Sequence, residues 1–167
     1  MLNKLAYTYE IYIGAPVDRV WAGLIDGDIT KKYVYGTRFD GKLKKGAPYA
    51  YVGDGDFKVV DGEILEVEPG KRLVMTWKAH WDDSVAKDPP SRVTYELSQA
   101  GSSTKLHLVH DDFDRQTATY TGSVQGWPLM LSSLKSILET GKPLAANWLF
   151  APGTVLNFDD LRSCGRQ

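Results

Sequence analysis

Apolar and polar residues alternate along the first stretch of the chain, from Tyr7 to Ile13. A period of two indicates a strand with one buried face. The segment from Gly14 to Pro16 ends this stretch, and apolar residues then recur at helical spacing from Val17 to Leu24. Asp26-Gly27-Asp28 interrupts that helix and supplies an N-cap for a second short helix, which we expect to reach about Tyr33.

The central part of the chain, from Thr37 to His110, consists of short apolar stretches separated by glycine-rich turns. β-branched and aromatic residues are frequent in these stretches, which favours strands. Tight turns join antiparallel neighbours, since parallel strands need longer crossovers. A glycine inside the third stretch, Gly62, indicates a bulge or bend. The six expected strands cover about 39–44, 49–52, 57–67, 73–78, 93–97 and 106–110.

The clearest helix in the sequence carries an apolar residue at every third or fourth position from Val124 to Leu138. Pro128 is tolerated in the first turn of a helix, so we expect this helix to begin between Ser123 and Trp127. Gly141 is expected to end it. A helix with one apolar face must bury that face, and the predicted sheet is the only large surface available.

Together these elements predict an α+β domain over residues 1–143, in which a curved antiparallel sheet of about seven strands wraps around one long helix. Residues 144–167 form a tail with two apolar stretches, 145–150 and 155–158. Such stretches are unfavourable in water. We therefore expect the tail to pack either on the domain or on a second subunit, as in a homodimer.

Charge and cysteine content narrow the class of partner and the compartment. The formal net charge is −1, which provides no general attraction for nucleic acid or an anionic membrane. No apolar stretch approaches the roughly 18 residues that span a bilayer, and the N-terminus lacks the apolar core of a signal peptide. The single cysteine, Cys164, cannot form an internal disulfide, so a reducing, cytoplasmic setting is expected. One local excess of positive charge, from Lys31 to Lys45, is either a solvated face or a docking surface for an acidic protein.

No metal, organic cofactor or catalytic residue is predicted. His80 lies near Asp82 and Asp83, but this spacing matches no metal motif. Gly53-Asp54-Gly55-Asp56 has the glycines of a phosphate loop without its lysine or its following helix, and we interpret it as a hairpin turn. The order of residues reveals no nucleophile–base pair.

The element order resembles the helix-grip fold of START-like proteins, the SRPBCC superfamily. Over about residues 6–143 the chain resembles, more narrowly, the family named after the activator of heat-shock-protein-90 ATPase (AHSA-like). Three segments carry this likeness: the first helix, Ala15-Pro16-Val17-Asp18-Arg19-Val20-Trp21 with Leu24; a hairpin with Gly62 through Val67, Pro69, Arg72-Leu73 and Thr76-Trp77; and the last strand and helix with Leu108, His110, Phe113, Gly126-Trp127, Leu131, Leu134-Lys135, Leu138-Glu139, Gly141 and Pro143. The resemblance implies the fold, a cavity between sheet and helix, and a link to chaperone or stress-response proteins.

The side chains expected to line that cavity come from the sheet and the long helix. Strand parity places His110 with Leu108, and Tyr95 with Leu97, on the face toward the helix. His110 and Tyr95 would supply its polar groups, with Tyr33 near the mouth. Ordinary packing in the core is the alternative for all of them. The full candidate set is Tyr33, Leu73, Trp77, Tyr95, Leu97, Leu108, His110, Trp127 and Leu131.

Three functions remain open on the sequence. The leading hypothesis is a non-enzymatic domain that binds a small apolar ligand in the cavity. The second is a chaperone or stress-response accessory protein that contacts its partner through the basic stretch or the tail. The third is a cyclase- or hydrolase-like enzyme in which the His110 imidazole acts as a general base.

Overall fold

The structure is a computed structural model that describes residues 4–144, and the predicted tail therefore lies outside the described residues apart from Leu144. The division into a domain over 1–143 and a tail stays a prediction. The elements are β1 (Leu5–Ile13), α1 (Val17–Ile25), α2 (Gly27–Tyr33), β2 (Arg38–Gly41), β3 (Pro48–Val52), the 3₁₀ turn η1 (Asp54–Asp56), β4 (Lys58–Glu68), β5 (Arg72–Ala79), α3 (Asp83–Ala86), β6 (Ser91–Ala100), β7 (Ser103–Phe113) and α4 (Ala118–Thr140).

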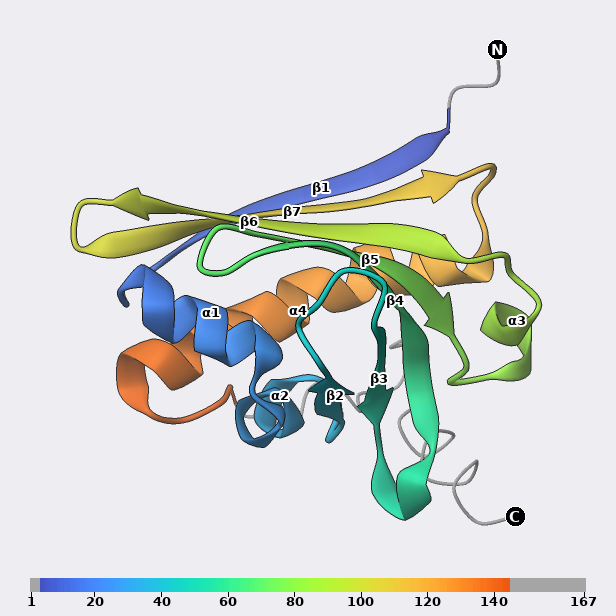
Figure 1. Cartoon of the computed structure of the whole chain (residues 1–167), viewed down its shortest axis with the longest axis horizontal. Helices are drawn as coiled ribbons and strands as arrows, with labels where there is room; N and C mark the ends of the chain where they lie inside the picture. Colours follow the sequence, from blue (N-terminus) through green and yellow to red (C-terminus); the bar gives the residue numbers. More distant parts are fainter. Residues whose placement is uncertain (1–3, 145–167) are drawn as a thin grey trace.

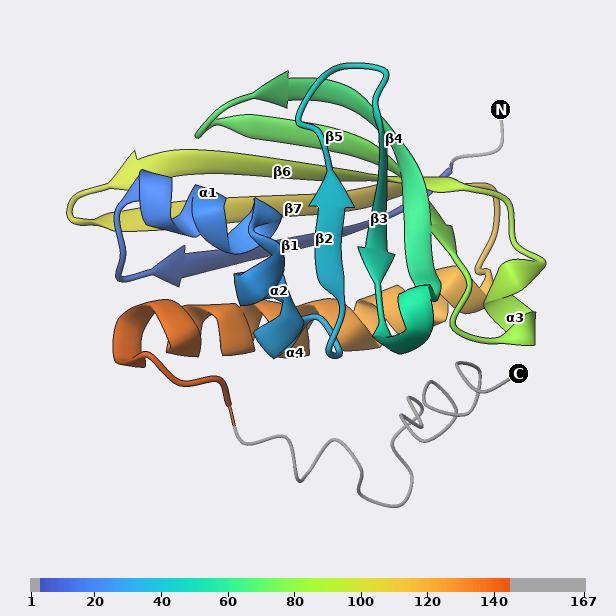
Figure 2. The same ribbon diagram turned by 60° about the horizontal axis from the view of Figure 1, so that its bottom comes forward.

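The strands form one antiparallel seven-stranded sheet in the order β1-β7-β6-β5-β4-β3-β2. Hairpins join all neighbours except β1 and β7, so the helix pair α1–α2 carries the chain from one edge of the sheet to the other. The sheet is strongly curved, and α4 lies along its concave side with α1 and α2 next to it (Figures 1 and 2). This arrangement confirms the predicted α+β helix-grip fold.

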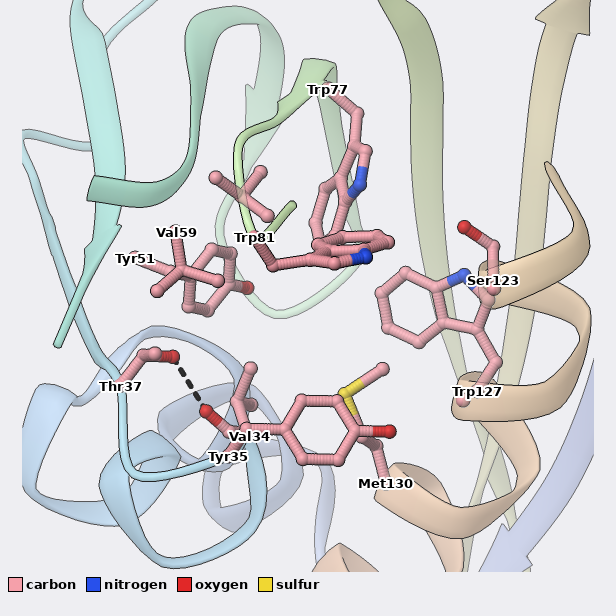
Figure 3. A pocket seen from close by; sticks show the side chains of 13 residues that line it. Val34, Tyr35, Thr37, Tyr51, Val59, Trp77, Trp81, Ser123, Trp127 and Met130 are labelled. Atoms are coloured by element: carbon pink, nitrogen blue, oxygen red, sulfur yellow. Dashed lines mark hydrogen bonds between the residues drawn. The ribbon is translucent and has the colours of Figure 1, made fainter. Parts of the chain in front are cut away.

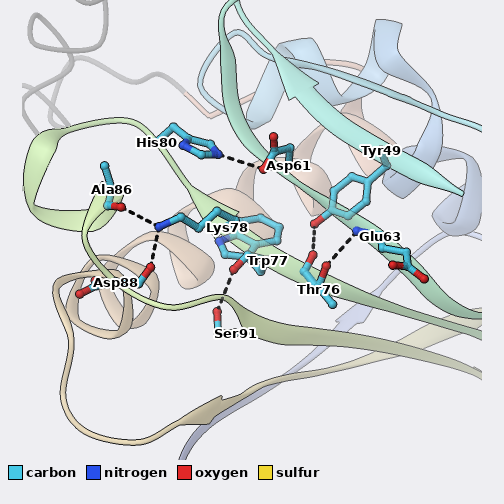
Figure 4. A network of polar contacts seen from close by, with 10 residues as sticks. All are labelled: Tyr49, Asp61, Glu63, Thr76, Trp77, Lys78, His80, Ala86, Asp88 and Ser91. Carbon is cyan, nitrogen blue, oxygen red and sulfur yellow. Dashed lines mark hydrogen bonds and ion pairs between the residues drawn. The ribbon is translucent and has the colours of Figure 1, made fainter. Parts of the chain in front are cut away.

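The curvature depends on irregular pairing in the strands that form the far wall. The register of β4 against β5 shifts between Ile64 and Glu66, just beyond Gly62, and such a bulge bends the strand. A Cβ on Gly62 would lie 2.3 Å from the carbonyl oxygen of Thr76, so only glycine permits this close approach. The Thr76 carbonyl accepts a hydrogen bond from the hydroxyl of Tyr49, and its side-chain oxygen accepts one from the N–H of Glu63 (Figure 4). The predicted irregularity in this strand is thus found between Ile64 and Glu66, shortly after Gly62.

Helix α4 begins earlier than the sequence suggested. Its first residue is Ala118, the side chain of the N-cap Thr117 accepts a hydrogen bond from the N–H of Tyr120, and Pro128 lies inside the helix. The expected start between Ser123 and Trp127 was therefore wrong. The buried carboxylate of Asp88 accepts hydrogen bonds from both the N–H and the hydroxyl of Thr119, and these contacts hold the first turn in place. The loss of one backbone hydrogen bond at Pro128 is offset by a buried face that continues on both sides of it. The expected end is confirmed, because Gly141 adopts a left-handed conformation with φ of 82°.

The loop between β5 and β6 contains the short helix α3, capped by the side chain of Asp82. The ammonium group of Lys78 donates to the carbonyl oxygens of Ala86 and Asp88, which ties this loop to the sheet (Figure 4). His80 pairs with Asp61 of β4 at 2.9 Å rather than with its loop neighbours. Within residues 4–144, no three His, Cys, Asp or Glu side chains lie together in a way that could bind a metal ion. The helices of the same region are too short or too polar to span a membrane.

Candidate functional site

The space between the sheet and α4 is mostly filled by packed side chains. All nine residues predicted to line a cavity are buried, with exposed fractions between 0% and 7%. The hydroxyl of Tyr33, expected near a mouth, donates instead to the carbonyl of Gly23 at 2.7 Å inside the core. Seven of the nine pack in this core away from any described void, and two border a slot: Trp77 and Trp127.

The slot opens at one end of the concave face, beside the first half of α4 (Figure 3). Its cavity volume is about 40 Å³, and it encloses about 530 Å³ when the open mouth is included. The walls come from the segment after α2, from β3, β4 and β5, from the start of the following loop, and from α4. The lining residues are Val34, Tyr35, Thr37, Tyr51, Val59, Val60, Trp77, Trp81, Gly122, Ser123, Gly126, Trp127 and Met130.

The slot exists because α4 carries small residues where it passes the aromatic side chains of the sheet. Gly122, Ser123 and Gly126 occupy adjacent turns of the helix on the slot side. Trp81 lies directly over this surface, since a Cβ on Gly122 would be 3.2 Å from its ring. Sequence reasoning missed Trp81 and the three small residues. The available signal was the spacing of small residues on a helix whose later turns carry leucine.

Aromatic rings form the deeper wall of the slot. The ring of Trp77 packs 5.3 Å from that of Trp127 and 5.6 Å from that of Tyr51, both at tilted angles. Tyr95 meets Trp127 edge-on at 5.9 Å from behind the wall. Pairs with these separations are favourable beyond the area they bury. The result is a rigid, flat-sided wall.

The buried His110 holds Trp127 in position through a chain of hydrogen bonds. The indole N–H of Trp127 donates to Nδ1 of His110 at 3.0 Å, so Nδ1 is the unprotonated nitrogen. Nε2 then carries the proton and donates to the hydroxyl oxygen of Ser91 at 2.7 Å. The Ser91 hydroxyl lies 3.4 Å from the carbonyl oxygen of Trp77, to which it donates (Figure 4).

Burial in this apolar core lowers the pKa of His110 to about 3, because the imidazolium form would lose its hydration. The ring is therefore neutral at physiological pH, and protein groups occupy both of its nitrogens. His110 does not border the slot and does not supply the general base that a cyclase- or hydrolase-like activity would need.

The tyrosine hydroxyls near the slot are equally constrained. Burial raises the pKa of Tyr51 to about 12 and raises the pKa of Tyr95 well above its usual value. These two side chains also interact by a hydrogen bond. Both phenols therefore stay protonated across the physiological range and act as structural groups.

The cationic side chains of the basic stretch from Lys31 to Lys45 do not line the slot, although Val34, Tyr35 and Thr37 of the same stretch do. They lie along α2, the edge strand β2 and the turn that follows. These cationic side chains are exposed. Arg38 pairs with Asp28 at 2.6 Å, and exposed pairs of this kind contribute little to stability. Lys42, Lys44 and Lys45 occupy the turn before β3. The stretch thus forms one accessible, positively charged edge.

A seven-stranded antiparallel sheet that curves around a long helix defines a START-like, helix-grip domain. The family described as "Activator of Hsp90 ATPase homolog 1-like protein" matches residues 14–139. The chain belongs to this family, as the sequence predicted. A search of curated proteins found no match.

Several solved structures are similar to this chain in fold. Protein MLL2253 from Mesorhizobium loti is 28% identical with a TM-score of 0.67, covering 80% of this chain and 96% of that one. DynU16, a putative protein in the dynemicin biosynthetic locus, is 27% identical with a TM-score of 0.67, covering 83% of this chain and 48% of that one. The Aha1 dimer from Colwellia psychrerythraea is 20% identical with a TM-score of 0.66, covering 83% and 98%, and this likeness is one of fold.

Proposed function

We propose that this domain binds a small apolar ligand in the slot between α4 and the curved end of the sheet. The observation that carries the proposal is the slot itself, an apolar, aromatic-walled opening that adjoins a core of packed side chains. Ligand sites in proteins are typically concave, mostly apolar and few in number. A protein that needed only to be stable would gain by filling this space, because voids lose packing contacts.

The slot must widen for a ring to enter. A cavity of about 40 Å³ is well below the roughly 150 Å³ of an engineered cavity that admits benzene. Two wall residues can give way. Trp81 is half-buried on a loop, and Met130 has a flexible, unbranched side chain that adapts to irregular spaces. Binding therefore includes a displacement of Trp81 and Met130 away from Trp77.

One structural relative supports the proposal that this domain handles a small molecule. DynU16, 27% identical to this chain, belongs to a biosynthetic locus, and a place in biosynthesis fits a domain that holds a small compound. The lone cysteine favours a cytoplasmic setting.

The test is binding of the fluorescent probe N-phenyl-1-naphthylamine to the full chain. Ser123→Leu places a larger side chain in the slot and should abolish the fluorescence increase. The matched control is Ser132→Leu, the same change on the same helix outside the slot lining, and this variant should bind like the wild type. Absence of binding to the wild type, or equal binding by the two variants, would overturn the proposal.

A second candidate function is that of a chaperone accessory protein, and family membership favours it. In this proposal the basic stretch contacts an acidic surface of the chaperone, because its lysines are exposed and clustered along one edge. Such an interaction weakens as salt screens it. The structural relative Aha1 from Colwellia psychrerythraea is a dimer. A homodimer is therefore one assembly that we consider for this chain.

This second function is tested with purified Hsp90 from the same host. The triple change Lys42→Glu, Lys44→Glu and Lys45→Glu should abolish salt-sensitive binding and any stimulation of ATPase activity. Reversal of three exposed lysines elsewhere, Lys58, Lys71 and Lys87, is the matched control and should leave binding intact. Failure of the wild type to bind, or equal loss in both triple variants, would reject this partner surface.

A further inference from the structure

Two of the three tryptophans that line the slot, Trp77 and Trp127, are buried, and their indole N–H groups differ in one respect. The N–H of Trp127 donates to His110 at 3.0 Å. The N–H of Trp77 is buried and has no hydrogen-bond partner among residues 4–144. Trp77 is 4% exposed, and its N–H therefore does not donate a hydrogen bond to bulk water. Most buried donors in native proteins are satisfied, and an exception calls for a specific explanation.

The position of this donor supplies the explanation. Trp77 lines the slot, and in Figure 3 its indole nitrogen lies on the side of the ring toward Ser123 and Trp127 of α4, which line the same slot. An unsatisfied donor in a solid core would destabilise the fold with no compensation. Next to an opening, the same donor can be satisfied by whatever enters.

The other lining residues restrict the chemistry of the ligand. Among the described residues of the slot, none has a charged side chain. A charged group placed there would lose its hydration without a counter-charge, which strongly opposes binding. The flat faces of Tyr51, Trp77 and Trp127 favour a planar ring system over a branched aliphatic molecule.

We infer that the slot takes an uncharged, planar ring compound that carries a hydrogen-bond acceptor oxygen, such as an aromatic ketone, and that the N–H of Trp77 donates to this oxygen. The inference rests on the proposed ligand-binding function and adds the ligand class and the recognising atom. A site that offers a buried donor discriminates against an analogue without the acceptor, because the donor then stays unpaired.

The experiment compares acetophenone with ethylbenzene, which have similar size and differ in the carbonyl oxygen. The full chain is labelled with ¹⁵N in its tryptophan indoles, and the Trp77 resonance is assigned from its absence in Trp77→Phe. Acetophenone should move the Trp77 N–H proton signal downfield, as a new hydrogen bond does, whereas ethylbenzene should perturb the slot without this downfield shift.

Affinity provides the second readout. Trp77→Phe keeps a flat ring and removes the donor, so it should weaken acetophenone binding about tenfold, roughly the contribution of one such hydrogen bond. Ethylbenzene affinity should change by less than about twofold. Trp81→Phe, which makes the same change in another slot residue, is the matched control and should leave the preference for the ketone unchanged.

The outcomes separate the two proposals. If both probes bind and the Trp77 signal responds identically to them, the donor role is wrong while ligand binding stands. If neither probe perturbs any slot resonance, the binding function fails, and the inference fails with it. Should Trp77→Phe not fold, the Trp77 indole resonance is assigned by through-bond correlation within the wild type, and the comparison of the two probes on the wild type then decides the donor role.

Discussion

The two halves of α4 face the same concave sheet but meet it differently. Residues 131–140 present Leu131, Leu134 and Leu138, which pack without a described void. Leu134 also packs closely against α1, since a Cβ on Gly23 would lie 2.7 Å from it. Residues 118–130 present glycine and serine toward tryptophan rings, and there the slot opens.

The difference shows how one helix can both stabilise a fold and leave room for a ligand. Aliphatic side chains interdigitate and fill space at the density of a crystal. Flat indole rings opposite glycine and serine fill space less completely, because the small residues have no side chain that reaches between the rings. The tight packing therefore belongs to the leucine half, and the opening belongs to the small-residue half.

The largest expected effect comes from the leucine half. Leu131→Ala should lower the free energy of unfolding by about 3 kcal/mol, because the side chain is fully buried and its removal leaves a cavity. Met130→Ala, its neighbour at the slot, should cost clearly less, since a void already adjoins it. Urea denaturation measures both. Equal losses would erase the distinction between the two halves.

The two buried tryptophans of the slot, Trp77 and Trp127, should respond differently to the same substitution. Trp127→Phe removes the donor to His110 and leaves a buried acceptor unpaired, which should cost about 2 kcal/mol. Trp77→Phe removes a donor that has no partner within the described chain and should cost much less. Thermal unfolding of the two variants side by side tests this, and a larger loss for Trp77→Phe would contradict it.

Acid should destabilise the fold through His110. Its pKa is about 3 in the folded protein, against 6.5 for an ordinary histidine, so between these pH values the unfolded chain binds one more proton. The contribution of the neutral ring is complete above pH 6.5 and is lost as the pH falls. The free energy of unfolding should decrease by about 1.4 kcal/mol per pH unit below that point.

Glutamine can replace the neutral ring without titrating, so His110→Gln should flatten this slope in urea denaturations between pH 7 and pH 5. The control is His107→Gln, on the same strand but only partly buried beside Glu10, which should retain the slope because His110 is intact. A slope that persists in His110→Gln would assign the acid sensitivity to other groups.

The smallest stability effect is expected at the slot mouth. Trp81→Ala removes a half-buried side chain from a loop and should cost only about 1 kcal/mol. Since Trp81 covers Gly122, its removal should speed entry of the naphthylamine probe several-fold in stopped-flow fluorescence. An unchanged association rate would show that Trp81 does not limit access.

The sequence was informative about the fold for a clear physical reason. Alternation, turn glycines and the leucine stripe each report local constraints, and together they allowed the sheet, the two short helices and the end of α4 at Gly141 to be predicted. The start of α4 was not predictable in this way. It depends on Asp88, which is distant in sequence and reaches the first turn only in the folded chain.

The candidate site was predicted only in part. Trp77 and Trp127 both belonged to the predicted set, and they do face each other and border the slot, because strand parity and helical spacing give the direction of a side chain. Whether a facing pair leaves a space between them depends on the volumes of residues from other elements, such as Tyr35 and Trp81.

By itself the sequence determined that this chain would fold as a curved sheet around one amphipathic helix, since periodicity and turn chemistry act over a few residues. Only the tertiary structure decided which part of the interior is solid and which part opens, and that His110 holds a tryptophan in place instead of facing a cavity. Packing volume and hydrogen-bond partners are properties of residues brought together from distant positions, and no local pattern carries them.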